Sequence, residues 1–136
     1  MANSYALEQV LRRASIPRGQ VTLLKYLYEQ DTDRWVSSSE LIEQIRWGDE
    51  ERFPGVLGAF GNRINATPEI TGEPGSSAFV ERNRGDKIQY RLRSEAREAI
   101  ENVQVLLDTF DRHSMSELLE PGTEIELAEL KPDDEE

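Results

Sequence analysis

The chain has 136 residues, of which 32% are charged, and a formal net charge of −11. It has no cysteine, which excludes disulfides and thiolate metal sites, and its one histidine, His113, excludes a histidine-rich metal site. No apolar run approaches the roughly 20 residues of a transmembrane helix, and the N-terminus lacks the apolar core of a signal peptide. We therefore expect a soluble, cytoplasmic protein with one domain, an extension and no cofactor.

The charge is unevenly distributed along the chain. Residues 108–136 hold 11 acidic and 2 basic residues, whereas residues 1–107 hold 16 acidic and 14 basic residues. An acidic protein is a poor partner for nucleic acid on charge alone, but here the body is nearly neutral and the end of the chain carries the excess. The basic residues are 13 arginines and only 3 lysines, a bias typical of a salt-adapted or GC-rich source.

The first half of the chain is predicted to be mainly helical. Apolar residues recur there at intervals of three and four, as on the buried face of a helix. Ser37 and Glu40 have the spacing of a capping box, which predicts a helix start. The predicted elements are a helix over Tyr5–Ala14, a helix over Gln20–Gln30, a short extended segment at Trp35–Val36, a helix from Ser37, and a helix over Glu51–Ala66.

The segment Phe79–Arg93 is predicted to be a β-hairpin. Apolar and polar residues alternate in its second half, as in a half-buried strand, and Asn83 and Gly85 suit a turn. Its five basic residues outnumber Glu81 and Asp86, so that the hairpin carries a local charge of +3. A basic hairpin on an acidic protein suggests a functional surface, although surface arginines on a hairpin are often only edge protection.

A long helix is predicted over Ser94–Phe110, followed by an acidic tail. Apolar residues in this helix repeat at nearly heptad spacing, which suits either a homodimer or packing in cis on Tyr5–Ala14. We place a domain at residues 1–110, with a core at about 20–93, and the tail at residues 111–136. The tail is interpreted as a protein-docking segment, as a cover for the basic hairpin, or as a solubilising extension.

The order helix, short strand, helix, helix, hairpin, helix resembles the winged helix-turn-helix superfamily over roughly residues 20–110. No subfamily is identified. The resemblance implies an α+β, mostly α fold, in which a three-helix core and a β-hairpin wing are flanked here by an added N-terminal helix and a long C-terminal helix. It also implies that the helix Glu51–Ala66 enters the major groove of double-stranded DNA and that the hairpin grips the backbone.

Candidate DNA-binding residues follow from this resemblance and from the chemistry of DNA. Phosphates are bound by long cationic side chains, and bases are read by arginine, asparagine or glutamine. Ser37, Ser38 and Ser39 are either helix caps or phosphate donors. The candidates for the backbone are Arg82, Arg84, Lys87 and Arg91, and the candidates for bases are Arg52, Asn62, Arg63 and Asn65.

Gly55, Gly58 and Gly61 recur every three residues in the predicted groove helix. Each costs about 0.5–1 kcal/mol relative to alanine, so the pattern suggests close packing inside the protein, close approach to DNA, or a helix that starts late.

Two functions suit the sequence. The first is a small, dimeric, DNA-binding transcriptional regulator. The alternative is a winged-helix interaction subunit of a larger nucleic-acid-processing or defence complex, without strong DNA binding of its own. We predict no enzyme, because no paired carboxylates, phosphate-binding glycine loop or nucleophile motif is visible.

Overall fold

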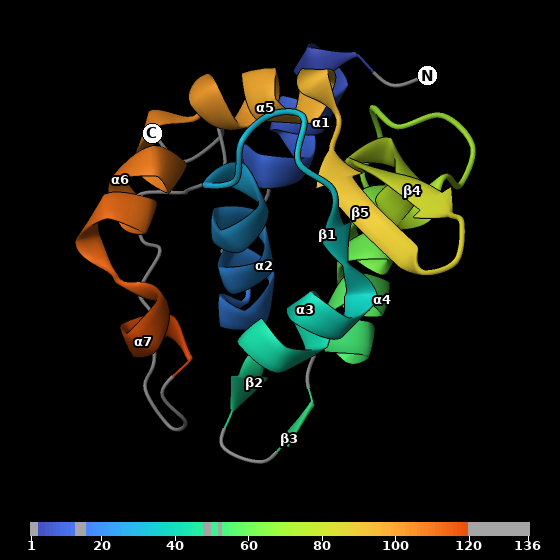
Figure 1. The fold of residues 1–136 in the computed structure, drawn as a ribbon. Coiled ribbons are helices and arrows are strands. Elements are labelled where there is room, and N and C mark those ends of the chain that lie inside the picture. Colours follow the sequence, from blue (N-terminus) through green and yellow to red (C-terminus); the bar gives the residue numbers. More distant parts are fainter. Residues whose placement is uncertain (1–2, 13–15, 48–49, 52, 120–136) are drawn as a thin grey trace.

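The computed structural model describes residues 3–12, 16–47, 50–51 and 53–119, and Figure 1 shows their arrangement. The described residues form an α+β structure that is mostly helical, as the sequence predicts. In chain order the elements are α1 (Ser4–Arg12), α2 (Arg18–Tyr28), β1 (Val36–Ser37), α3 (Ser38–Gln44), β2 (Arg46–Trp47), β3 (Glu50–Glu51), α4 (Phe53–Asn65), the 3₁₀ turn η1 (Gly75–Ala78), β4 (Val80–Arg84), β5 (Ile88–Leu92), α5 (Ser94–Glu101), α6 (Gln104–Arg112) and α7 (Met115–Leu118).

The predicted hairpin forms two strands of a three-stranded antiparallel sheet. Strand β5 lies at the centre, between β4 and the short β1, with Val80 opposite Leu92 and Val36 opposite Tyr90. Tyr90 and Leu92 are buried, whereas Gln89 and Arg91 on the alternate face are half-buried. The sequence alternation is therefore confirmed as a strand with one face on the core. Strands β2 and β3 form a separate antiparallel pair.

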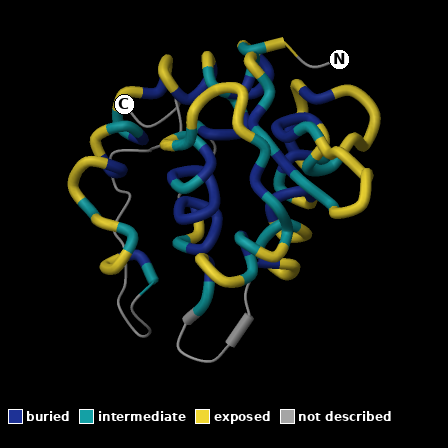
Figure 2. The backbone as a smooth tube through the Cα atoms, in the orientation of Figure 1, coloured by how far each residue is buried: buried dark blue, intermediate teal, exposed yellow. Residues whose placement is uncertain are grey.

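One hydrophobic core joins the helices to the sheet. Helix α2 lies near the middle of the molecule, between α6 and α7 on one side and the sheet on the other (Figure 1). Buried backbone positions concentrate in α2 (Figure 2). Phe60 of α4 packs edge-on against Phe79 at 4.8 Å between ring centroids, and Phe53 packs in the same way against Tyr90. These aromatic pairs fix α4 against the sheet. No helix among the described residues has the length and apolarity needed to cross a membrane.

The predicted helix Ser94–Phe110 is wrong as a single element. The chain bends after Glu101, and Val103 has φ −110° and ψ 85° before α6 begins. Helix α5 runs across the top of the molecule, and α6 runs down its side (Figure 1). The apolar stripe stays in the core across the bend, because Ile100, Val103 and Leu106 are all fully buried. The spacing of apolar residues does not reveal the bend, because buried residues recur at intervals of three and four on both sides of it.

The same burial bears on the predicted homodimer. The apolar positions of the stripe lie inside the core of a single copy, and α5 packs on α1. Packing in cis, the second sequence interpretation, is therefore what the structure shows. The fully buried positions of the stripe, such as Ile100 and Leu106, are not available to a second copy, and the homodimer itself stays a prediction.

The predicted boundary between residues 110 and 111 falls inside α6. Beyond it, α7 begins at a capping box formed by Ser114 and Glu117, and Leu118 is fully buried. Arg18 of α2 donates from Nε and Nη2 to the carbonyls of Leu118 and Glu117, at 2.6 and 2.8 Å. The folded unit therefore extends to about Leu118, and residues 120–136 of the predicted tail lie outside the described residues.

Helix C-termini are capped by cationic side chains from other elements. The clearest case is Arg97 of α5, whose guanidinium donates to the carbonyls of Leu27, Tyr28 and Gln30 at the end of α2. The last carbonyls of a helix lack intrahelical donors and carry the negative end of the helix dipole, so a buried cation there satisfies both needs. The other caps are Arg63 on Val10, Arg12 on Asn102, Lys25 on Phe110, and Arg93 on Ser77 of η1.

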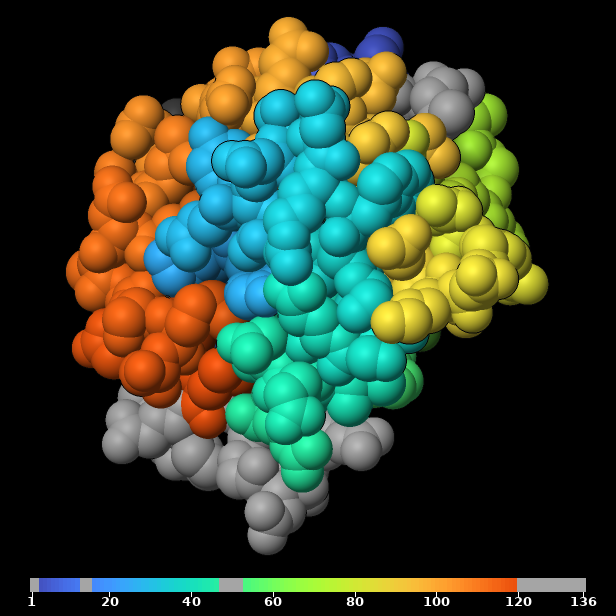
Figure 3. All heavy atoms as spheres, viewed as in Figure 1, coloured from blue at the N-terminus to red at the C-terminus, as the bar shows by residue number. Residues whose placement is uncertain are grey.

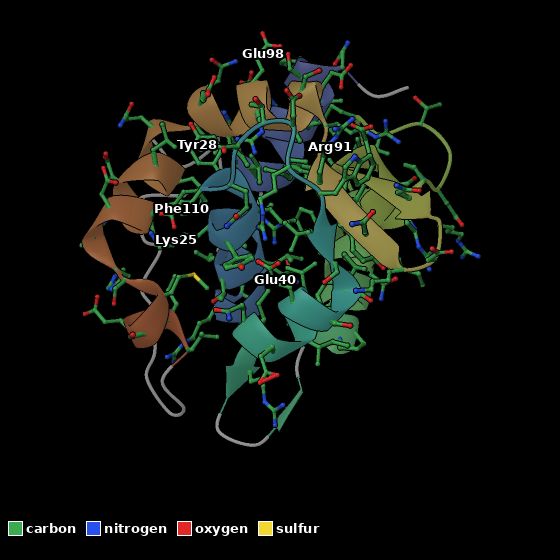
Figure 4. The ribbon with its side chains drawn as sticks, in the orientation of Figure 1. Lys25, Tyr28, Glu40, Arg91, Glu98 and Phe110 are labelled. Atoms are coloured by element: carbon green, nitrogen blue, oxygen red, sulfur yellow. The ribbon has the colours of Figure 1, made fainter. Side chains whose placement is uncertain are left out.

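We predict that Arg97→Gln lowers the free energy of unfolding by about 2–3 kcal/mol, because hydrogen bonds to a charged group contribute about 1.5–3 kcal/mol and the carbonyls lose their donor. Urea unfolding followed by circular dichroism measures the change. Glu98→Gln is the matched control, since Glu98 is the exposed neighbour of Arg97 (Figure 4), and it should change stability by less than about 0.5 kcal/mol. Equal stability of the two variants would contradict the capping role.

The three glycines of α4 have different surroundings. A Cβ atom at Gly61 would lie 3.2 Å from the backbone nitrogen of Ser76 in η1, whereas a Cβ atom at Gly55 or Gly58 would meet nothing within 4 Å. Close packing inside the protein therefore explains Gly61 alone. Gly55 and Gly58 are exposed within the helix, so the late-start interpretation is excluded for both.

We predict opposite effects of alanine at two of these positions. Gly58→Ala should stabilise the protein by about 0.5–1 kcal/mol, because alanine favours the helix and nothing opposes its methyl group. Gly61→Ala should destabilise it by about 1 kcal/mol, because the backbone of η1 has to shift. Thermal and urea unfolding of the two variants provide the test, and equal changes of the same sign would contradict the packing argument.

Candidate nucleic-acid interface

Three cationic side chains are exposed at the tip of the hairpin. Arg82 and Arg84 lie on β4, and Lys87 is the last residue of the turn at residues 85–87. The Arg82 guanidinium lies 5.9 Å from the ring centroid of Tyr90, while Arg84 and Lys87 make no ion pair or hydrogen bond with the described chain. We call these three residues the basic tip. The hairpin protrudes at the side of the molecule away from α6 and α7 (Figure 3).

Unlike the residues of the basic tip, Arg91 is bound to other parts of the protein. Its guanidinium donates to both carboxylate oxygens of Glu81, directly opposite on β4, at 3.3 and 3.2 Å. It also lies over the Trp35 ring, at 4.3 Å from the centroid, and donates to the carbonyl of Asp33. Figure 4 shows it on the sheet, toward the segment that leads into β1. Arg91 thus joins that segment to the sheet, and its charge is balanced by Glu81.

The structure separates the predicted base-reading residues of α4. Asn62 is exposed. Arg63 is directed into the protein, where its Nε donates to the Val10 carbonyl at 3.0 Å, and the Asn65 side chain accepts from the Gly75 backbone nitrogen at 2.8 Å. Arg52 lies outside the described residues. Only Asn62 of the four is therefore described on the open face of the helix.

The open face of α4 is smooth and uncharged. It is formed by exposed residues that have small or short side chains, namely Pro54, Gly55, Gly58, Ala59 and Asn62. Such a face can approach another surface closely, but it offers few hydrogen-bonding groups to a base edge.

Ser37 is confirmed as a helix cap. Its side chain accepts a hydrogen bond from the Glu40 backbone nitrogen at 3.1 Å at the start of α3. The Glu40 carboxylate does not complete the capping box with Ser37. It instead binds Arg34, whose nitrogens lie 2.7 and 3.1 Å from its two oxygens, and accepts from the Tyr26 hydroxyl.

The basic tip is distinctive when all described cations are compared. The other arginines and lysines in the described ranges each interact with the rest of the protein, most of them with helix-end carbonyls or with acids. Sequence reasoning grouped Arg52, Arg63 and Arg91 with the basic tip as candidates for contact with DNA. No local pattern reveals which cation reaches a helix end far along the chain, as Arg97 reaches α2 across some 70 residues.

The described residues contain no group of three or more histidine, cysteine, aspartate or glutamate side chains suited to a metal ion. Comparisons with protein-family models, with curated proteins and with solved structures find no match to this chain.

The cluster of Tyr26, Glu40 and Arg34 has shifted pKa values. Burial, together with the Glu40 carboxylate, raises the pKa of the Tyr26 hydroxyl to about 12. Hydrogen bonds from Arg34 and Tyr26 lower the pKa of Glu40 below its usual range. The folded protein holds the Tyr26 proton more tightly than the unfolded chain does. The protonated hydroxyl therefore contributes to the free energy of unfolding, fully below pH 10 and progressively less as the pH rises toward 12.

We predict that the free energy of unfolding of the wild type falls more steeply between pH 10 and pH 12 than that of Tyr26→Phe, which lacks the titrating hydroxyl. Urea midpoints at half-unit pH intervals measure the difference. All other groups are the same in the two proteins, so their contributions cancel in the comparison. Parallel curves for the two proteins would show that the Tyr26 pKa is not raised.

Proposed function

We propose that this chain is a winged-helix protein that binds the phosphate backbone of double-stranded DNA through the basic tip of its hairpin. The order α2, β1, α3, α4, β4, β5, into which the β2–β3 pair and η1 are inserted, and the sheet order β1-β5-β4 support the winged-helix resemblance. In this proposal β4 and β5 are the wing and α4 is the helix that faces the groove.

The observation that carries the proposal is the location of uncommitted positive charge. The three described cations of the basic tip have no acidic or carbonyl partner, and all three project from one hairpin. A cation that is paired with an acid is already neutralised and binds a phosphate weakly. An unpaired cation releases condensed counterions when it binds DNA. Asp86 lies beside the tip and partly offsets its charge.

Sequence reading by α4 is the weaker part of the proposal. Asn62 is the described polar side chain on its open face, and an asparagine can pair with adenine. One such contact gives modest discrimination, so we propose binding that depends mainly on the backbone. A role in transcription regulation would then draw its specificity from a partner or from DNA shape.

The proposal predicts salt-dependent binding to a duplex. With three phosphate contacts, the slope of log K against log salt should be about −2.7. The triple variant Arg82→Gln, Arg84→Gln, Lys87→Gln should lose nearly all of this dependence and most of its affinity at low salt. Fluorescence anisotropy with a labelled 20-base-pair duplex, titrated at several salt concentrations, measures both quantities.

Two matched variants in the same hairpin serve as controls. Arg82→Lys with Arg84→Lys keeps the charge and should retain the slope, and Asp86→Asn removes a repelling carboxylate and should strengthen binding. No binding by the wild type at low salt, or equal binding by the triple variant, would exclude the proposal. Circular dichroism checks that each variant is folded.

A second candidate function is a protein-interaction subunit of a nucleic-acid complex. It is favoured by the smooth open face of α4, which allows close approach but carries no uncommitted cation in the described structure. Gly58→Phe would block a protein partner on that face and leave backbone binding by the basic tip intact. A pull-down with this variant and with the triple tip variant separates the two functions.

A further inference from the structure

A hollow of 490 Å³ lies at the base of the hairpin, away from the basic tip. It is formed by the start of α1, by the chain between α4 and β4, and by the residue that follows β5. Its polar lining residues are Asn3, Glu69, Thr71, Ser77 and Arg93, beside the aromatic Tyr5. The volume falls in the range of sites for small molecules, which are usually about 300–1,000 Å³.

Two opposite charges line this hollow without neutralising each other. Arg93 donates from Nε to the Ser77 carbonyl at 2.7 Å, which holds its guanidinium beside the lining. Neither Arg93 nor Glu69 forms an ion pair with any described residue, although both face the same space. The terminal nitrogens of Arg93 and the Glu69 carboxylate therefore remain as one cationic and one anionic contact for a ligand.

Tyr5 adds an apolar contact at the same place. It is the one large hydrophobic side chain with high exposure among the described residues, at 61%. An exposed aromatic ring beside a hollow can cover the apolar part of a ligand, and its burial by that ligand is favourable. The ring, the guanidinium and the carboxylate are supplied by three segments far apart in the sequence.

We propose that this hollow binds a small zwitterion, an α-amino acid with an apolar side chain. Arg93 binds its carboxylate, Glu69 binds its ammonium group, and Tyr5 covers its side chain. A simple anion fits less well, because Glu69 repels it, and a simple cation is repelled by Arg93. The proposal does not depend on DNA binding, since the basic tip lies at the other end of the hairpin.

Binding of L-phenylalanine and L-leucine to the full chain tests the proposal. Titration of the ¹⁵N-labelled protein with each amino acid, up to millimolar concentrations, should shift the amide signals of residues 3–6, 69–78 and 93 in a saturable manner. Glu69→Gln should weaken binding about tenfold or more, because it removes a charge-assisted contact with the ammonium group. Glu98→Gln, an exposed substitution on α5, should leave the affinity unchanged.

Modified ligands test the same contacts without changing the protein. N-acetyl-L-phenylalanine lacks the ammonium group, so it should bind the wild type weakly and should not be weakened further by Glu69→Gln. L-phenylalaninamide lacks the carboxylate, so it should bind the wild type weakly and be insensitive to Arg93→Lys. This ligand series keeps the test decisive even if an Arg93 variant fails to fold.

Three outcomes would overturn the proposal. They are the absence of saturable shifts with either amino acid, equal affinity for the modified and free amino acids, and an unchanged affinity in Glu69→Gln. Loss of DNA binding by the basic-tip variant, measured separately, has no bearing on these outcomes.

Discussion

The capping of helix C-termini by cations is the interaction on which the arrangement of this protein depends. Short helices, several of eleven residues or fewer, have little stability alone and leave carbonyl groups unsatisfied at their ends. Arg97 closes α2 with three hydrogen bonds and fixes α5 across it. Arg18 and Lys25 use the same chemistry from α2 to hold α7 and α6, and Figure 4 shows Lys25 directed toward Phe110. The helices are thus linked end to side by charge as well as by the core.

This use of cations gives the arginine-rich composition a structural meaning. A guanidinium can donate to several carbonyls from one planar group, which an ammonium does less well in a fixed geometry. Arg97 contacts three carbonyls and Arg18 contacts two. The bias toward arginine is therefore partly a requirement of the fold, whatever the source of the protein. It also leaves few cations for a partner.

Much of the fold could be predicted from the sequence, and less of the candidate site. Apolar spacing predicted the helices, and alternation predicted β5. When one face of a helix or strand is buried, apolar residues recur at the period of that element. The bend at Val103 was not predicted, because no glycine or proline marks it and the spacing of buried residues is the same on both sides. In the site, exposure of the basic tip followed from the hairpin pattern. The inward orientation of Arg63 and the pairing of Arg91 depend on segments distant in sequence, which no local spacing records.

The described structure places three unpaired cations on one hairpin, so positive charge is concentrated at one place in a protein that is acidic overall. The net charge of −11 repels a polyanion at long range, yet the field of that polyanion turns the hairpin toward it as the two approach. For the proposed complex, repulsion by the net negative charge and attraction by the hairpin act in opposite directions on the rate of encounter. Salt screens the longer-ranged repulsion first, so association would be fastest at an intermediate ionic strength, although the affinity falls steadily as salt is added.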